Sequence, residues 1–242
     1  MSSEKACNRL RVLVIIPAYN EQGKIGRVIK KIPKESADKV IVIDDGSSDG
    51  TAAEAEGAGA TVLRHASNLG VGAAIRTGID HALSNAYDVV VVLSGDDQHD
   101  PTEIPGLLDP IVTEQYDFVQ GSRRFRGLQA PHINGLRRSL TWVYSATFRL
   151  LTGFPCTDAT NGGRAFRTRI FENGRINLWQ DWLNSYELEP YLLYSAVKSG
   201  VRTTEAPMKV IYHQDGTTKM RPVRDWWRLL RPLVFLALGL RK

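Results

Sequence analysis

The chain has 242 residues, of which 43% are hydrophobic and 24% charged, an ordinary globular composition. This excludes a disordered tail, a coiled coil and a polytopic membrane protein. The net charge is +5, and it is unevenly distributed along the chain. Residues 202–242 carry nine Lys or Arg and three acids, whereas the other 201 residues carry 22 Lys or Arg and 23 acids. The positive end therefore predicts a local partner rather than a generally basic surface, and we expect no nucleic acid partner.

Apolar runs typical of strands alternate with helical patterns in the first half. Strands are predicted at residues 11–16, 39–43, 60–63, 87–93 and 118–120, and helices at 21–32, from 51, at 71–83 and at 102–112. The run at 89–93 is apolar throughout, which indicates a strand covered on both faces. Repeated strand–helix units predict a three-layer α/β/α fold with a mostly parallel central sheet.

The pattern changes after Gly121. Residues 122–138 hold five arginines, two glycines and a proline without periodicity, which predicts a long loop. The remaining predicted elements are helices at 139–151 and 187–198, a strand at 203–212, and an aromatic, leucine-rich end at 225–240. We divide the chain into a main domain, residues 1–221, and a basic amphipathic C-terminal segment, residues 222–242.

Targeting and redox signals are few. Cys7 and Cys156 are too few for a disulfide framework and predict free thiols, as in a cytosolic protein. The apolar run at 12–16 is too short for a secretion signal. The longest apolar stretch, 229–240, is interrupted by an arginine, a proline and a glycine, and falls short of the roughly 20 residues of a spanning helix. We expect a cytoplasmic protein that does not cross a membrane by itself.

Polar residues follow four of the predicted strands. The segments are Pro17-Ala18-Tyr19-Asn20-Glu21, residues 44–51 beginning Asp44-Asp45-Gly46, residues 94–101 beginning Ser94-Gly95-Asp96-Asp97, and Gly121-Ser122-Arg123. Ligands of open parallel sheets bind outside the carboxyl ends of the strands, so we expect these segments to line one crevice. Carboxylates there can bond base and ribose groups, and a central acid can hold a hard divalent cation against a diphosphate.

These segments, in this order and spacing, resemble the GT-A family 2 glycosyltransferases. The second half resembles the polyprenyl-phosphate sugar transferases, such as the dolichyl-phosphate mannose synthases. The similarity covers most of residues 10–220, and its motifs are specific as a set and weak singly. It implies a GT-A fold in which residues 1–221 are the catalytic domain. It also implies inverting transfer of a sugar from a nucleotide sugar donor to a polyprenyl phosphate acceptor, assisted by a divalent metal, Mg²⁺ or Mn²⁺.

The resemblance, together with the cations available for the acceptor, implies roles for individual residues. The expected nucleotide-binding residues are Pro17, Tyr19, Glu21, Asp44, Asp45 and Asp96, and the expected metal ligands are Asp96 and Gln98. The expected catalytic residues are Asp96, Arg123 and Asp158. The residues expected to bind the acceptor phosphate are Arg137, Arg138, Lys219 and Arg221. Ser94 stands where the family has the first aspartate of its Asp-x-Asp motif. We expect weaker metal binding unless Asp97 or Glu21 supplies a carboxylate.

The expected mechanism follows from the charge of the acceptor. A phosphate monoester has a second pKa of about 6, so near pH 7 it is largely a dianion and already a nucleophile. Such an acceptor needs positioning by cations more than it needs a general base, and arginine offers bidentate contact to phosphate. Asp96 and its metal would hold the departing diphosphate.

Several alternatives stay open. The same chemistry could act on a soluble glycan or small molecule, with Asp158 or Glu187 as the base, or the chain could bind a nucleotide sugar without catalysis. Residues 68–73 lack the third glycine of a dinucleotide fingerprint. We interpret His99 as structural, and His65 and His81 as surface residues.

The C-terminal segment has two interpretations. It predicts an interfacial helix with Trp226 and Trp227 at headgroup depth, which would make the protein peripheral on the cytosolic face of a membrane. The other interpretation is a helix packed on the domain with its arginines outside.

Overall fold

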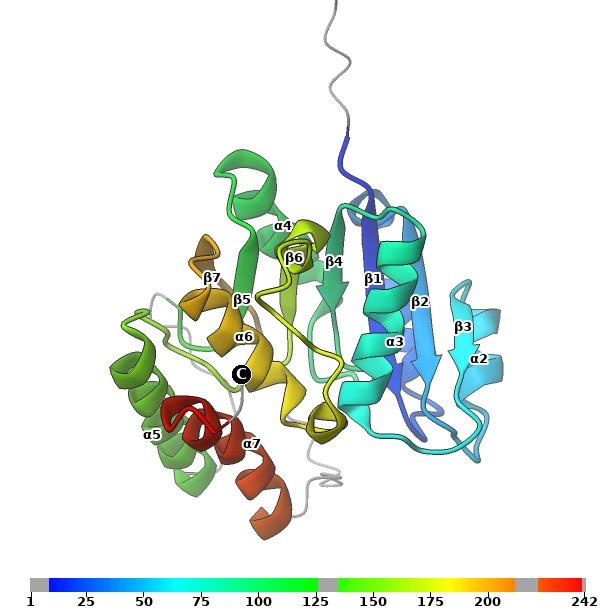
Figure 1. Ribbon diagram of the computed structural model, residues 1–242. Helices are drawn as coiled ribbons and strands as arrows, with labels where there is room; N and C mark the ends of the chain where they lie inside the picture. Colours follow the sequence, from blue (N-terminus) through cyan, green and yellow to red (C-terminus); the bar gives the residue numbers. More distant parts are fainter. Residues whose placement is uncertain (1–8, 126–134, 212–221, 241–242) are drawn as a thin grey trace, which may run out of the picture.

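The computed structural model describes residues 9–125, 135–211 and 222–240 (Figure 1). They build a seven-stranded sheet in the order β3-β2-β1-β4-β6-β5-β7. The strands are β1 (Val12–Ala18), β2 (Lys39–Asp44), β3 (Thr61–Arg64), β4 (Val89–Val92), β5 (Phe118–Ser122), β6 (Arg164–Arg167) and β7 (Thr203–Pro207). All are parallel except β6, which runs antiparallel to β4 and β5. The mixed, mostly parallel sheet confirms the prediction.

Two strands differ from the sequence-based prediction. We predicted no strand at β6, because four residues with an arginine at each end carry no recognisable alternation. β7 ends at Pro207, earlier than the predicted 212, and a proline has no N–H with which to continue a ladder.

Helices cover both faces of the sheet and so make three layers (Figure 1). They are α1 (Ile25–Lys31), α2 (Thr51–Gly57), α3 (Val71–Ser84), α4 (Ile104–Thr113), α5 (Gly135–Thr152), α6 (Leu188–Lys198) and α7 (Pro222–Ala237), with short 3₁₀ turns at Lys34–Ser36, Pro101–Glu103, Thr168–Phe171 and Asp181–Leu183. α1 begins four residues later than predicted, since Gly23 has a φ of +81°, outside the helical range. α5 begins inside the predicted loop.

The alternation of β1 shows how the two cores form. Leu13 and Ile15 belong to the core shared with α3, α5, α6 and α7, and Val14 and Ile16 to the core shared with α1, α2 and α4. All four side chains are fully buried. Gly78 of α3 lies so close to β1 that a Cβ there would stand 2.9 Å from Cγ2 of Ile15. The helix layer thus packs tightly enough on the sheet to hold the strand ends in place.

The C-terminal helix α7 shares this main core. Leu229 and Leu233 are buried in it, and the hydroxyl of Tyr144 on α5 donates to the carbonyl oxygen of Leu229 at 3.0 Å. Within residues 9–125, 135–211 and 222–240, no helix is both long and apolar enough to cross a membrane.

Candidate functional site

The loops after β1 and β2 are joined by hydrogen bonds at one edge of the sheet. Ala18 pairs with Asp44 in the parallel register, and the backbone N–H of Asp45 donates to the Ala18 carbonyl at 2.8 Å. Further on, the Glu21 N–H donates to the Thr51 hydroxyl at 2.8 Å. The two segments therefore lie side by side at the carboxyl ends of β1 and β2.

Asp44 is the last residue of β2 and is fully buried. One carboxylate oxygen accepts from the Ser47 N–H at 2.9 Å, and the other stands 3.2 Å from Nε of Arg64. Arg64 pairs with Asp44 across β2 and β3, and its side chain is 58% exposed. Arg64 therefore covers the carboxylate that we expected to meet the nucleotide. The sequence analysis missed this residue, and its only signal is its position at the end of β3.

Asp45 holds the loop that leads into α3. Its carboxylate accepts from the backbone N–H groups of Leu69 and Gly70 at 2.9 and 2.8 Å, and it contacts Nδ1 of His65 at 2.7 Å. Nε2 of His65 contacts the Thr77 hydroxyl at 3.0 Å, and the imidazole is only 11% exposed. Our interpretation of His65 as a surface residue is therefore wrong, because the loop folds back over it.

The glycines of residues 68–73 serve close packing. Gly70 has a φ of +102°, and a Cβ on Gly72 would lie 2.3 Å from the carbonyl oxygen of Leu183. The Ala73 N–H donates to the Asn184 carbonyl at 3.1 Å. The start of α3 is thus packed directly against the segment before α6.

Asp96 follows β4 and is partly exposed at the centre of the strand ends. The Ser94 hydroxyl donates to one of its carboxylate oxygens at 2.7 Å, and the Gln98 N–H donates to the same oxygen at 3.1 Å. Ser94 therefore orients the single acid, whereas a second carboxylate at this spacing would repel it.

Asp97 does not replace the missing acid. It is buried, has a φ of +62°, and forms ion pairs with Arg27 and Lys31 of α1 at 3.1 and 3.0 Å. Burial alone would raise its pKa, but these two cations hold the pKa of Asp97 below its usual range. Glu21 is also buried and pairs with Lys24 at 3.3 Å. Across the part of the chain that the structure describes, no cluster of three His, Cys, Asp or Glu side chains could enclose a metal ion.

The side chain of His99 holds the loop after β4, which carries Ser94 and Asp96. It is buried, and its Nδ1 accepts from the Ser94 N–H at 3.1 Å. Burial lowers the pKa of His99, although the nearby Asp96 opposes the change, so the ring is neutral near pH 7. This placement agrees with the structural role that the sequence suggested.

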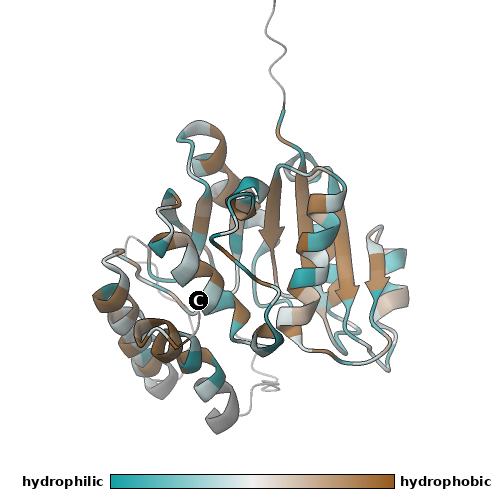
Figure 2. Ribbon diagram, in the orientation of Figure 1, coloured by the Kyte–Doolittle hydropathy of each residue, from teal (hydrophilic) through white to brown (hydrophobic). Residues whose placement is uncertain are grey.

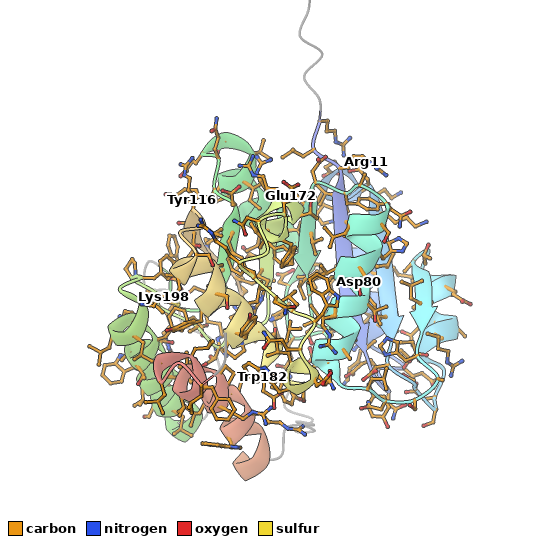
Figure 3. The ribbon with its side chains drawn as sticks, viewed as in Figure 1. Arg11, Asp80, Tyr116, Glu172, Trp182 and Lys198 are labelled. Atoms are coloured by element: carbon orange, nitrogen blue, oxygen red, sulfur yellow. The ribbon has the colours of Figure 1, made fainter. Side chains whose placement is uncertain are left out.

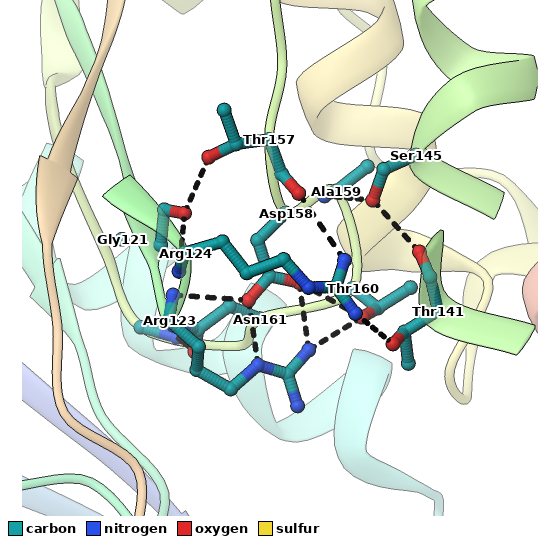
Figure 4. Close-up of polar contacts among 12 residues, drawn as sticks. Gly121, Arg123, Arg124, Thr141, Ser145, Thr157, Asp158, Ala159, Thr160 and Asn161 are labelled. Atoms are coloured by element: carbon teal, nitrogen blue, oxygen red, sulfur yellow. Dashed lines mark hydrogen bonds and ion pairs between the residues drawn. The ribbon is translucent and has the colours of Figure 1, made fainter. Parts of the chain in front are cut away.

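Arg123, at the end of β5, is clamped by Asp158 (Figure 4). Nε and Nη2 of Arg123 donate to the two carboxylate oxygens at 2.6 and 2.7 Å, its backbone N–H donates at 3.1 Å, and Nη2 also reaches the Thr160 hydroxyl at 2.6 Å. Both side chains of the pair are buried. Burial by itself would raise the pKa of Asp158, but Arg123 holds it below the usual range. Because both oxygens are engaged, Asp158 positions Arg123 and is poorly placed to take a proton.

Glu205 of β7 fixes the segment that carries Asp158. This buried carboxylate accepts from the backbone N–H groups of Thr157 and Asp158 at 2.8 and 3.1 Å and from the Thr157 hydroxyl at 2.7 Å. The sequence analysis missed Glu205, whose only signal is an acid within a strand. Arg124, also missed, donates to the Thr157 carbonyl at 3.3 Å and contacts the Thr141 hydroxyl.

Of the predicted acceptor-phosphate residues, the structure describes the side chain of Arg138. Arg138 is exposed near the start of α5, and its carbonyl oxygen accepts from Nη2 of Arg124 at 3.2 Å. Lys219, Arg221 and the side chain of Arg137 lie outside the described residues, so their predicted role stays a prediction.

Glu187, the other carboxylate that we considered as a base, is bound to α7. It is buried, and its Oε1 accepts from Nη2 of Arg231 at 2.8 Å and lies 3.7 Å from Arg228. The Arg231 guanidinium also stands 5.6 Å from the ring centre of Trp182, which lies beside α7 (Figure 3). The acid thus connects the C-terminal helix to the domain.

Comparisons with known proteins agree with this architecture. The family model described as Glycosyl transferase family 2 matches residues 13–175. The undecaprenyl-phosphate mannosyltransferase of Micrococcus luteus is 31% identical and aligns over 87% of this chain and 88% of that protein. The UDP-N-acetylglucosamine–dolichyl-phosphate N-acetylglucosaminyltransferase of Methanococcus voltae is 27% identical and aligns over 94% of this chain and 96% of that protein.

A solved structure shows the same fold. Glucosyl-3-phosphoglycerate synthase from Mycobacterium tuberculosis, in complex with Mn²⁺, uridine diphosphate and glucosyl-3-phosphoglycerate, superposes with a TM-score of 0.71 at 20% identity. The superposition covers 96% of this chain and 81% of that chain. This likeness is one of fold, and it confirms the predicted three-layer GT-A architecture.

Proposed function

This chain belongs to glycosyl transferase family 2, and we propose that it transfers a sugar from a nucleoside diphosphate donor to a polyprenyl phosphate. The observation that supports a phosphate acceptor is that both candidate general bases, Asp158 and Glu187, form ion pairs with arginines. Both oxygens of Asp158 are bound by Arg123, and the buried Glu187 is paired through Oε1 with Arg231 of α7, so each carboxylate already serves as the counter-charge of an arginine and is poorly placed to deprotonate a hydroxyl. A phosphate dianion needs no such base, whereas a sugar or alcohol acceptor does.

On the donor side, we propose that Pro17, Tyr19, Glu21 and Asp44 line the nucleotide site and that Asp45 shapes it by holding the loop before α3. The nucleobase of a donor that enters this site has to displace Arg64 from the Asp44 carboxylate or share the carboxylate with Arg64.

We propose that the oxygen donors after β4 hold a divalent cation. The Asp96 carboxylate, with the Gln98 side chain and the Ser94 hydroxyl, would hold Mg²⁺ or Mn²⁺, which typically takes one or two carboxylates and completes its shell with water and substrate phosphate. When bound, the ion would neutralise charge on the leaving diphosphate. Arg123, held rigid by Asp158, would orient the acceptor phosphate for inverting attack on the anomeric carbon.

We further propose that the enzyme works at the cytosolic face of a membrane, with α7 as a peripheral contact. The presence of the lipid acceptor in that membrane and the basic charge of residues 222–242 support this location.

Transfer assays test the proposal directly. A panel of radiolabelled nucleotide sugars is offered with detergent-dispersed polyprenyl phosphate, with 3-phosphoglycerate, or with no acceptor, each with Mg²⁺, Mn²⁺ or EDTA. We expect label in the organic phase for at least one donor, only with the lipid acceptor and metal. Label transferred to the soluble acceptor alone, or donor binding without turnover on any acceptor, would contradict it.

Ser94 offers a test of the metal site that does not depend on turnover. In Ser94→Asp, two carboxylates would stand within hydrogen-bond distance, so we expect a lower Tm than wild type in EDTA and a larger rise in Tm on adding Mn²⁺. Ser94→Ala, which removes the hydroxyl without adding charge, is the control and should show no enlarged rise. Equal Mn²⁺-dependent shifts in all three proteins would place the cation elsewhere.

A further inference from the structure

The loop after β4 reverses its direction at an unusual residue. β4 is hydrophobic along its whole length (Figure 2), whereas the loop that follows at residues 94–100 holds three aspartates. Asp97 in this loop has a φ of +62°, a left-handed conformation in which residues other than glycine are uncommon. Directly after it, the Gln98 N–H donates to the Asp96 carboxylate at 3.1 Å. The conformation of Asp97 therefore directs the chain back toward Asp96.

The side chain of Asp97 is buried and forms two ion pairs with α1. Its Oδ2 lies 3.1 Å from Nε of Arg27, and its Oδ1 lies 3.0 Å from Nζ of Lys31. Arg27 and Lys31 are four residues apart and so lie on the same side of the helix. Their side chains are 56% and 43% exposed, so only the carboxylate is enclosed by the contact. We call the two ion pairs together the Asp97 anchor, because they attach the loop after β4 to α1.

Helix α1 continues directly from the predicted nucleotide segment that ends at Glu21. The N–H of Ile25, the first residue of α1, donates to the Glu21 carbonyl at 3.0 Å. The loop after β4 also packs against the beginning of that segment, since a Cβ on Gly95 would stand 3.2 Å from the Pro17 carbonyl oxygen. The loop is thus fixed to the nucleotide segment at two points, through the backbone of Gly95 and through the Asp97 anchor.

The loop after β1 is held in a similar way. Asn20 is also a non-glycine residue with a positive φ, of +52°. Its side-chain oxygen accepts from the Ser48 N–H at 2.9 Å, which attaches the loop after β1 to the loop after β2. Left-handed residues of this kind cost free energy and persist where the surrounding structure holds them, most often at functional sites. Two such residues in neighbouring strand-end loops indicate that the placement of these loops matters to the donor site.

We propose that Asp97 is a positioning residue for the donor. The Asp97 anchor holds the loop after β4 in place, so that Asp96 meets the donor diphosphate without first having to be ordered. The inference deepens the proposed function and rests on it for the nucleoside diphosphate. Without the anchor, binding has to order the loop, and ordering the backbone of a single residue lowers affinity by about tenfold. The charge of Asp97 acts in the opposite direction, since a carboxylate repels a diphosphate.

Hydrogen exchange measured by mass spectrometry on the full chain tests the anchor without any ligand. Asp97→Asn keeps the shape of the side chain and its tolerance of a positive φ but removes the charge. Peptides that cover residues 94–101 should exchange about tenfold faster in Asp97→Asn and about threefold faster in Lys31→Met, with peptides of α3 unchanged. Lys30→Met makes the same change at the neighbouring exposed lysine of α1 and is the matched control, which should exchange as wild type. Unchanged exchange of the loop in Asp97→Asn would overturn the anchor.

Calorimetric titration of the same proteins with UDP and with GDP, each with Mn²⁺, tests the positioning. Whichever nucleotide the wild type binds should bind about tenfold more weakly to Asp97→Asn and about threefold more weakly to Lys31→Met. The double variant should bind no more weakly than Asp97→Asn, because both changes break the same contact. A pure charge effect has the opposite sign for Asp97→Asn, which removes a negative charge near the diphosphate. In transfer assays the KM for the donor should rise by the same factor and kcat should fall less than about threefold, because the bound donor orders the loop.

The outcomes separate the positioning role from the proposed function. Equal or tighter nucleotide binding by Asp97→Asn, in a loop that exchanges faster, would overturn the positioning role and leave the transferase function standing. Binding of neither nucleotide by the wild type would refute the proposed donor class, and the positioning role with it. Lys31→Met removes only an exposed cation, so it keeps the comparison possible where Asp97→Asn fails to fold. Failure of the function is thus seen in the wild type, and failure of the positioning role in the difference between the wild type and the variants.

Discussion

Asp96→Asn should lower the rate of sugar transfer by about a hundredfold or more, with little change in stability. Asp96 is partly exposed, and its hydrogen bonds from the Ser94 hydroxyl and the Gln98 N–H can also be made to an amide oxygen, so the fold tolerates the change. The variant loses the charge that we expect to hold a cation against the diphosphate, and one such electrostatic contact contributes about 10²–10³ to kcat. Steady-state transfer assays under saturating metal give kcat, and thermal unfolding gives Tm.

Asp109→Asn serves as the control for that measurement. Asp109 is an exposed acid on α4, remote from the strand ends, and should leave both kcat and Tm unchanged. If Asp96→Asn turned over at the wild-type rate, the centre of the crevice would not be the diphosphate site.

Asp158→Asn should lower the free energy of unfolding by about 3–5 kcal/mol and reduce transfer by about a hundredfold. The change leaves the buried guanidinium of Arg123 without its counter-charge, and a single unpaired buried charge costs about this much. The loss of the clamp also frees the arginine that we expect to orient the acceptor. Urea unfolding followed by circular dichroism measures the first effect, and kcat/KM for the lipid acceptor measures the second.

A double variant distinguishes packing from function at this pair. Arg123→Met with Asp158→Leu replaces both charges by apolar groups of similar size, so much of the stability should return while transfer stays lost. Asp117→Asn breaks a pair of the same 2.6 Å separation with the exposed Arg169 and a longer, 3.8 Å pair with Arg167, and should cost less than Asp158→Asn. Recovery of transfer in the double variant would show that the pair only supports the fold.

The pH dependence of this pair has a definite sign. Because the folded pKa of Asp158 is held below the ordinary carboxyl value of about 4, the unfolded chain takes up its proton first as the pH falls. The stability that the carboxylate contributes is therefore complete above about pH 5 and is lost at more acidic pH. The stability difference between the wild type and the double variant should be constant from pH 5 to 8 and shrink below it.

Much of the fold could be predicted because its signals are local. The apolar run of β4 indicates a strand buried on both faces, and the strand–helix alternation indicates a parallel sheet. The polar segments were expected to lie near one another, since the carboxyl ends of parallel strands share one edge of the sheet, and those after β1 and β2 are joined by hydrogen bonds there. β6 escaped prediction because its pairing with β4 and β5 comes from distant parts of the chain and leaves no pattern in four residues.

The sequence by itself determined which acids follow the strand ends, and the tertiary structure decided which cations meet them and which of the acids are engaged. The two neighbouring acids Asp96 and Asp97 differ in their surroundings. Asp96 is partly exposed, whereas Asp97 is buried and paired with two cations of α1. Asp158 is bound by an arginine 35 residues away. Burial and long-range ion pairing set the charge, pKa and freedom of a carboxylate, and both depend on packing between segments that no local pattern records.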